Sequence, residues 1–323
     1  MSSFRRRGIA VARCIAFLLP VLAHGADDLD EVTITASPLG HGDSLATLVE
    51  SVDRDELVRR GAASLGDALS NVPGVSASGF AAGASRPIIR GLDSSRVRIL
   101  EIVRGAGTLR YGSQAIGGVV NTINGRVPVM LDADPLRGEA SAAWGSAADS
   151  REGAGRIDGH TGTFAWHGDG FLRRTEDYDT PLGTQQGSWF DGKGGSLGAG
   201  FVGDAGRAGA AIVRYDAKYG LPNGDSYIDM RQDKLLVRGA RDLGWGPLSS
   251  VTLDAGYADY EHAERESDGT PVATFLDEEW EARAEALFAR VGPFDSSAIG
   301  AQFHRRRFAA RGEAADYLQP TLS

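Results

Sequence analysis

The 323-residue sequence predicts an α+β domain followed by the antiparallel strands of a transmembrane β-barrel. Glycine accounts for 44 residues, roughly twice its ordinary share, which favours strands and turns over helices. The second half repeatedly alternates apolar with polar or small residues, the period of a strand with two unlike faces. After residue 26 no run of about 18 apolar residues occurs, so a membrane role would require strands.

The first 26 residues have the layout of a secretory signal peptide. Arginines at 5–7 precede an apolar stretch over 14–23, and small residues follow at Gly25 and Ala26. We expect cleavage after one of these two residues. The only cysteine, Cys14, leaves with this segment, so the exported chain has neither disulfides nor thiolate chemistry.

Composition and motifs exclude several functions. Charged residues make up 24% of the chain and the formal net charge is −9, so we expect no nucleic-acid partner. The sequence shows no Gly-rich phosphate loop, nucleophile elbow or carboxylate pair. We therefore predict that the protein is not an enzyme, and we expect no cofactor.

The mature chain divides into three parts. Residues 27–47 are polar and lack a helical period, which predicts a flexible arm. Residues 48–130 have a mixed pattern, with Asp53 and Ser64 each placed to cap a short helix, and the second helix ending at residues 73–74. Short apolar or β-branched runs predict strands over 87–90, 96–100, 101–104 and 118–123. This part is predicted to be a small α+β domain.

The third part, residues 136–323, is predicted to be all strand. Ala211, Val213 and Tyr215 share one face of a predicted strand, with Arg214 and Asp216 on the other. We count about nine such segments: 136–146, 154–163, 164–175, 193–203, 207–220, 232–242, 248–262, 273–291 and 295–308.

Short turns alternate with long polar loops between these segments, a pattern typical of an outer-membrane barrel. A soluble, secreted β-sandwich also has alternating strands and remains the alternative. A second ambiguity concerns residues 273–291, because Trp280, Ala284 and Leu287 also fit a helical stripe. The neighbouring strands favour strand there.

Four motifs between residues 64 and 121 are specific when taken together. They are Ser64-Leu65-Gly66-Asp67-Ala68-Leu69 with Val72-Pro73-Gly74-Val75, Arg86-Pro87-Ile88-Ile89-Arg90-Gly91, Val103-Arg104-Gly105, and Leu109-Arg110-Tyr111-Gly112-Ser113 with Ile116-Gly117-Gly118-Val119-Val120-Asn121. They resemble the plug domain of TonB-dependent outer-membrane receptors. The motif residues of greatest interest are Arg86, Pro87, Arg90, Gly91, Arg104, Gly105, Tyr111, Gly112, Gly117 and Gly118.

The resemblance implies an order of signal peptide, TonB box, plug and 22-stranded barrel. It implies a receptor in the Gram-negative outer membrane that contacts membrane lipid and the TonB energy-coupling protein. The sequences of the motifs most resemble those of receptors for zinc or other metals, so the implied substrate is a metal ion or metal chelate. A surface protein that binds a ligand without transporting it is the alternative.

The TonB box would be the short β-prone peptide near the predicted cleavage site. It comprises Glu31, Val32, Thr33, Ile34, Thr35 and Ala36. Such a peptide on a flexible arm can add as an edge strand to a partner's sheet, where main-chain hydrogen bonds supply the affinity. Without the plug motifs behind it, the same peptide would be read as an ordinary first strand.

Two departures from the family predict an incomplete receptor, truncated or internally deleted and possibly unable to transport. Leu100 runs directly into Glu101, where relatives have an intervening stretch that carries an Asp-His pair in the zinc-type receptors. A 22-stranded barrel also needs on the order of 500 residues, far more than residues 136–323 provide. About nine of the 22 strands are expected.

The histidines give only weak candidates for a metal site. His262 lies beside Glu261 and Glu264 near a predicted strand end, where the three could form a weak metal-binding loop. His160 and His167 are seven residues apart, which on one strand would put them on opposite faces unless a turn intervenes.

Overall fold

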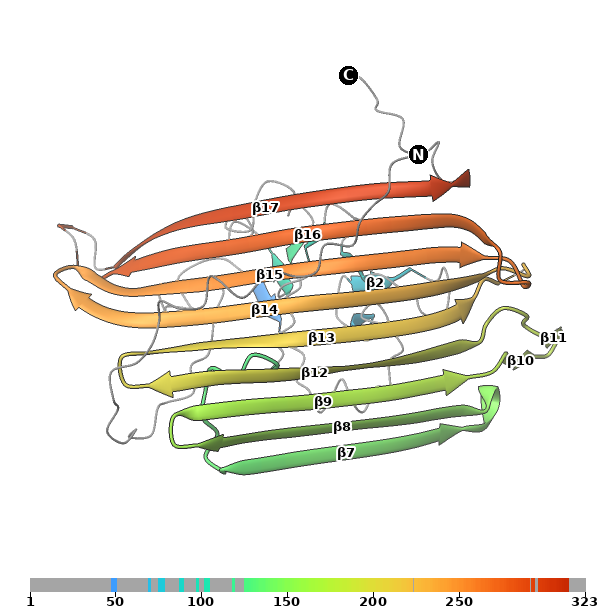
Figure 1. The fold of residues 1–323 in the computed structure, drawn as a ribbon, viewed down its shortest axis with the longest axis horizontal. Coiled ribbons are helices and arrows are strands. Elements are labelled where there is room, and N and C mark those ends of the chain that lie inside the picture. Colours follow the sequence, from blue (N-terminus) through green and yellow to red (C-terminus); the bar gives the residue numbers. More distant parts are fainter. Residues whose placement is uncertain are drawn as a thin grey trace, which may run out of the picture.

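The computed structural model describes the second half of the chain almost continuously. The described residues are 48–50, 69–70, 75–78, 87–89, 97–98, 102–104, 118–119, 125–222, 224–290, 292–293 and 296–313. Figure 1 shows the main feature, a broad sheet of long strands lying side by side from β7 to β17.

Six short strands belong to the N-terminal part. They are β1 (Leu48–Glu50), β2 (Val75–Ala77), β3 (Pro87–Ile89), β4 (Val97–Arg98), β5 (Ile102–Arg104) and β6 (Gly118–Val119). Four of them pair in the order β1-β5-β6-β4, and β2 pairs with β3. Each of the four strands predicted here contains an observed strand. Leu69, the last residue of the predicted Ser64–Leu69 motif, has helical backbone.

The large sheet has nine strands, the number expected from the sequence. They are β7 (Leu136–Gly145), β8 (Ser150–Thr161), β9 (Phe164–Thr175), β12 (Phe190–Gly203), β13 (Gly206–Gly220), β14 (Tyr227–Trp245), β15 (Leu248–Arg265), β16 (Pro271–Phe288) and β17 (Ser297–Gly312). Each pairs antiparallel with the next. The 3-10 helix η3 (Ser146–Ala148) joins β7 to β8, and the hairpin β10 (Asp179–Thr180) with β11 (Gly183–Thr184) lies between β9 and β12.

Residues 273–288 of the ambiguous segment 273–291 lie in the strand β16, so the helical alternative is wrong there. From Ala273 to Phe288, β16 pairs with both β15 and β17, and Trp280 lies opposite both Tyr257 and Arg305. The Glu, Ala and Arg content favours a helix locally, but pairing on both sides satisfies the backbone of the segment as a strand.

The two ends of the sheet differ in their connections. At one end, two residues at 162–163, 204–205 and 246–247 and a longer stretch at 289–296 join the strands. At the other, the connections 176–189, 221–226 and 266–270 are longer, and η3 lies in the remaining one. We call these the short-turn end and the long-loop end.

The two faces of the sheet also differ. We call inner the face that residues 126–129 contact, where Val127 and Val129 bury Ala211 on β13 with Leu236 alongside. On the opposite, outer face, large apolar side chains are open to the surroundings: Ile157, Leu197, Phe201, Ile212, Leu253, Ile299 and Phe303 are each 45% to 68% exposed.

A band without charged side chains crosses the outer face. Toward the long-loop end one charged residue bounds it on each of eight strands: Arg151, Arg174, Lys193, Arg214, Asp233, Asp259, Glu278 and Arg305. On β14 the band runs from Asp233 to Arg241 with Leu235, Val237 and Gly239 between them, about 26 Å of strand.

The boundary of this band is inclined to the strand pairing. From Arg174 on β9 the register leads across the sheet to Arg311 on β17, but the boundary there is at Arg305, six residues lower. Six residues are about 20 Å along a strand, and six interstrand steps are about 29 Å. The strands are therefore tilted by about 35° from the perpendicular to the band, the tilt found in membrane barrels.

The sheet is open where the structure describes it. Within residues 125–313, apart from the positions left undescribed, β7 pairs only with β8 and β17 only with β16. In the part of the chain that the structure describes, no helix has the length and apolar character needed to cross a membrane.

Candidate functional site

The stretch that leads from the N-terminal part into β7 lies on the inner face of the sheet. Val127 is 8% exposed and Val129 is 7% exposed, and both pack on Ala211. The following residues approach β8, where His160 N–H donates to the Pro135 carbonyl at 3.0 Å. The connection is thus laid along the wall before the first long strand begins.

Glycines in β12 form the floor beneath this stretch. A Cβ on Gly198 would overlap the carbonyl oxygen of Arg126, and a Cβ on Gly200 would overlap that of Pro128. On β13 a Cβ on Gly209 would lie 3.0 Å from Val127. Because glycine has no side chain, the connecting backbone can lie directly on the backbone of the wall.

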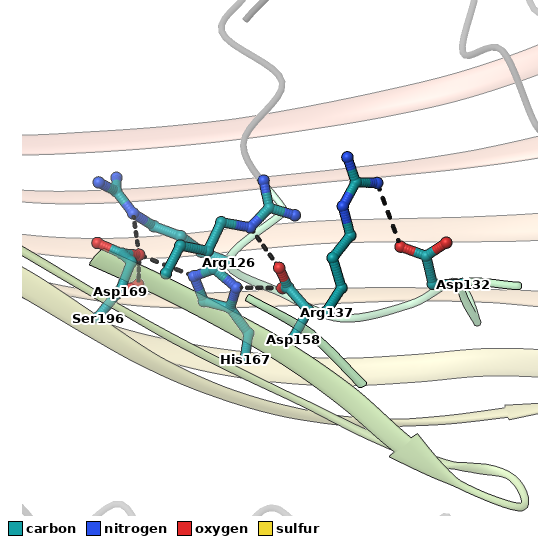
Figure 2. Close-up of polar contacts among 8 residues, drawn as sticks. Arg126, Asp132, Arg137, Asp158, His167, Asp169 and Ser196 are labelled. Atoms are coloured by element: carbon teal, nitrogen blue, oxygen red, sulfur yellow. Dashed lines mark hydrogen bonds and ion pairs between the residues drawn. The ribbon is translucent and has the colours of Figure 1, made fainter. Parts of the chain in front are cut away.

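A cluster of charged and polar side chains holds the same stretch from the side. Arg126 Nε donates to Asp169 Oδ2 at 3.3 Å, and the Ser196 hydroxyl donates to the same oxygen. His167 Nε2 lies 2.8 Å from Asp169 Oδ2, and His167 Nδ1 lies 2.6 Å from Asp158 Oδ1. Figure 2 shows His167 between the two carboxylates, with Ser196 beside Asp169.

The cluster is well shielded and its charges are matched. The His167 side chain is only 3% exposed, and each of the two carboxylates is 18% exposed. Arg156 pairs with Asp158 as Arg126 does with Asp169. Buried ionic groups persist only when they are paired and hydrogen-bonded, a condition that this arrangement meets.

Toward the long-loop end the inner face becomes aromatic. Phe171 stacks on Tyr215 with ring centroids 5.9 Å apart, and Phe190 stacks on Tyr219 at 6.3 Å. Figure 1 places the strands concerned, β9, β12 and β13, next to one another in the sheet. The long-loop end therefore presents an apolar inner wall.

The residues expected to form a weak metal-binding loop do not share a face. His262 is on the inner face, where it lies 2.9 Å from the Tyr260 hydroxyl and packs edge-on against Phe275 at 5.4 Å. Glu264 shares that face by alternation, whereas Glu261 is on the outer face. No group of three or more His, Cys, Asp or Glu residues suited to a metal ion occurs among the described residues.

A turn brings His160 and His167 to the same face. Residues 162–163 reverse the chain, so that Asp158 pairs with His167 and His160 pairs with Ala165. Both histidines therefore point inward, as the sequence allowed if a turn lay between them. His160 Nε2 contacts the Asp132 carbonyl at 3.1 Å, and His167 contacts the two aspartates. Each ring has its own partners.

Most of the motif residues lie outside the described part of the chain. This holds for the box Glu31 to Ala36 and for Arg86, Arg90, Gly91, Gly105, Tyr111, Gly112 and Gly117. Pro87 begins β3, Arg104 ends β5 and Gly118 begins β6.

Comparison with known protein families gives one match. The model of the TonB-dependent Receptor Plug Domain matches residues 43–101. That range includes the Ser64 and Arg86 motifs, and it ends where Leu100 meets Glu101.

Solved structures match over more of the chain. The copper transporter OprC matches with a TM-score of 0.65 at 15% identity, covering 77% of this chain and 44% of that chain. The siderophore receptor PirA from Acinetobacter baumannii matches with 0.62 at 16%, covering 82% and 48%. The FrpB iron transporter from Neisseria meningitidis matches with 0.61 at 13%, covering 83% and 49%.

These likenesses concern the fold. At 13% to 16% identity they show that the chain shares the fold of these structures over the part that matches. The chain spans about half the length of the structures it matches.

Proposed function

We propose that the chain acts in energy-coupled uptake of a metal ion or metal chelate across the outer membrane, because residues 43–101 match the plug domain of TonB-dependent receptors and the chain shares its fold with a solved copper transporter and a solved siderophore receptor. TonB-dependent receptors are transporters and not enzymes. The observation that carries the proposal is the plug match at residues 43–101, followed from residue 136 by strands whose outer face carries an uncharged band.

The uncharged band supports the membrane location. A bilayer excludes charged side chains from its core and leaves no water for unpaired backbone groups. The band is about 26 Å long along β14, and because the strands are tilted by about 35° its height is about 21 Å, close to the roughly 25 Å apolar belt of membrane barrels. Short turns would then lie in the periplasm and long loops outside the cell.

The proposed organisation follows the order expected from the sequence. Residues 1–26 are a cleaved signal peptide, 27–47 an arm in the periplasm, 48–130 the plug and 136–323 strands of the barrel wall. The box Glu31 to Ala36 on the arm pairs with an edge strand of TonB. Force on the arm then rearranges the plug and opens a path along the inner face.

The substrate class rests on two supports. The matched structures are named as a copper transporter, a siderophore receptor and an iron transporter. The sequences of the plug motifs in this chain most resemble those of receptors for zinc or other metals. The proposal is therefore a metal ion or its chelate, with lipid and TonB as the macromolecular partners.

Proline substitutions in the box test the coupling. Val32→Pro with Ile34→Pro removes two backbone donors that an added strand needs, so capture of TonB by the full-length receptor should fall at least tenfold. Energy-dependent accumulation of radioactive metal should be lost in the same cells, while binding at the cell surface stays. Val32→Ala with Ile34→Ala, which keeps the donors, is the control.

Surface binding with no energy-dependent accumulation, in both the unsubstituted protein and the proline variant, would instead support the alternative of a ligand-binding surface protein. TonB capture that is insensitive to the prolines would remove the assigned box.

A further inference from the structure

We infer that residues 126–129 are a fixed anchor that holds the end of the plug on the barrel wall, and that Asp169, His167 and Ser196 are its positioning residues. The contacts of residues 126–129 are the basis for the anchor, and only its role in transport rests on the proposed function. The anchor gives a common role to the buried His167 cluster and to the glycines of β12.

The steric half of the anchor is a fitted slot. Gly198 and Gly200 are successive inner-face positions of β12, and the carbonyl oxygens of Arg126 and Pro128 lie directly over them. Val127, which lies between Arg126 and Pro128, also faces the sheet, because its side chain packs over Gly209 and Ala211 of β13. The connecting backbone therefore runs alongside β12: each step of two residues in the connection matches a step of two residues in the strand.

The electrostatic half of the anchor locks the start of the slot. Asp169 receives Arg126, Ser196 and His167 on one oxygen, and Asp158 holds the far side of the imidazole. These groups come from β8, β9 and β12, so side chains of three adjacent strands position the one carboxylate that binds Arg126. Moving Arg126 away would leave a mostly buried carboxylate without its cation, which costs far more than breaking an exposed ion pair.

The anchor determines which part of the chain can move when the plug rearranges. Gly125 precedes Arg126, and a Cβ there would meet only the end of the Arg156 side chain, at 3.4 Å. From residue 126 onward the chain is held on the wall, and it enters β7 at Leu136. Rearrangement of the plug during uptake must therefore take place N-terminal to residue 126, while residues 126–129 keep their contacts.

Trypsin cleavage after Arg126 tests the anchor without any transport assay. A protease needs several residues of free extended chain, so the Arg126–Val127 bond should resist in the full chain inserted in outer-membrane vesicles. Gly200→Ala, whose methyl group overlaps the Pro128 carbonyl, should release the fragment beginning at Val127 at least tenfold faster. Gly155→Ala is the matched control, because its methyl group meets no atom closer than 3.9 Å.

A charge variant tests the positioning residues in the same assay. Asp169→Asn keeps the size of the side chain but removes the charge that faces Arg126, and should speed cleavage severalfold. Asp254→Asn is its control, because it breaks the ion pair with Arg238 at 2.7 Å on the inner face of another strand pair. Asp169→Glu should restore most of the resistance, which a purely structural defect would not allow.

Two results would overturn the anchor. One is cleavage after Arg126 in the unsubstituted protein as fast as in the urea-unfolded chain. The other is equal cleavage in Asp169→Asn and Asp254→Asn, which decides the matter even where Gly200→Ala gives no inserted protein.

Discussion

At the scale of single residues, Asp177 organises the long loop between β9 and β12. Its Oδ1 accepts the backbone N–H of Ser188 at 2.8 Å and that of Trp189 at 2.9 Å, and the Ser188 hydroxyl at 3.3 Å. Ser188 is 7% exposed, so these donors have little access to water. One carboxylate oxygen therefore ties the start of the loop to its end.

We expect Asp177→Ala to free the loop without unfolding the sheet. Leaving buried donors unpaired costs about 1–3 kcal/mol. Amide hydrogen exchange at Ser188 and Trp189 should become about tenfold faster or more, since 1.4 kcal/mol is a factor of ten. Asp179→Ala is the control, because Asp179 accepts only the Thr184 hydroxyl, at 2.7 Å in an exposed hairpin. Unchanged exchange in Asp177→Ala would show that other contacts hold the loop.

The residue scale also shows what the sequence could not predict. Alternation along β8 and β9 predicts which side chains share a face within each strand, but not which ones meet across strands. The two-residue turn at 162–163 sets that register and brings Asp158 opposite His167. Counting the same number of residues in both directions from this turn pairs Asp158 with His167, and this count could have identified the cluster from the sequence.

At the scale of elements, the strand pattern was predictable because each strand has two different surroundings. All nine long strands were predicted, but β14 extends from 227 to 245 where 232–242 was expected. The extra residues at its long-loop end include Asp229 and Arg231 on the outer face, above the band. The outer face becomes charged there, although the apolar residues Ile228 and Met230 continue on the inner face and the pairing continues.

The outer-face band makes a prediction for β14. Val237 is 36% exposed within the band, so Val237→Arg would place a cation in the bilayer and cost about 2–4 kcal/mol. Urea unfolding of the inserted protein should report this loss, together with a lower yield in the outer membrane. Ala309→Arg, on the outer face of β17 beyond Arg305, should change neither. Equal effects of the two substitutions would place the membrane boundary elsewhere.

At the scale of the whole molecule, the difference between the two ends of the sheet predicts how the proposed receptor is oriented in the membrane. The connections 176–189, 221–226 and 266–270 are at one end, and two-residue turns join most strands at the other. Membrane barrels of this kind have long loops outside the cell and short turns in the periplasm.

Cysteine labelling tests this orientation, since residues 15–323 contain no cysteine. Asp225→Cys, in the 221–226 loop, should react with a membrane-impermeant maleimide on whole cells. Ala205→Cys, exposed in a short turn, should react only after the outer membrane is opened. Labelling of Ala205→Cys on intact cells would reverse the orientation.

The pairing of each long strand with its neighbour in the chain also has a kinetic consequence. Every contact that builds the sheet is local, so the wall can form hairpin by hairpin without first closing a long loop. Each new strand would find its register from the turn just made, with β7 as the constant starting edge. Lengthening the turn at 162–163 should therefore slow membrane insertion more than it lowers the final stability.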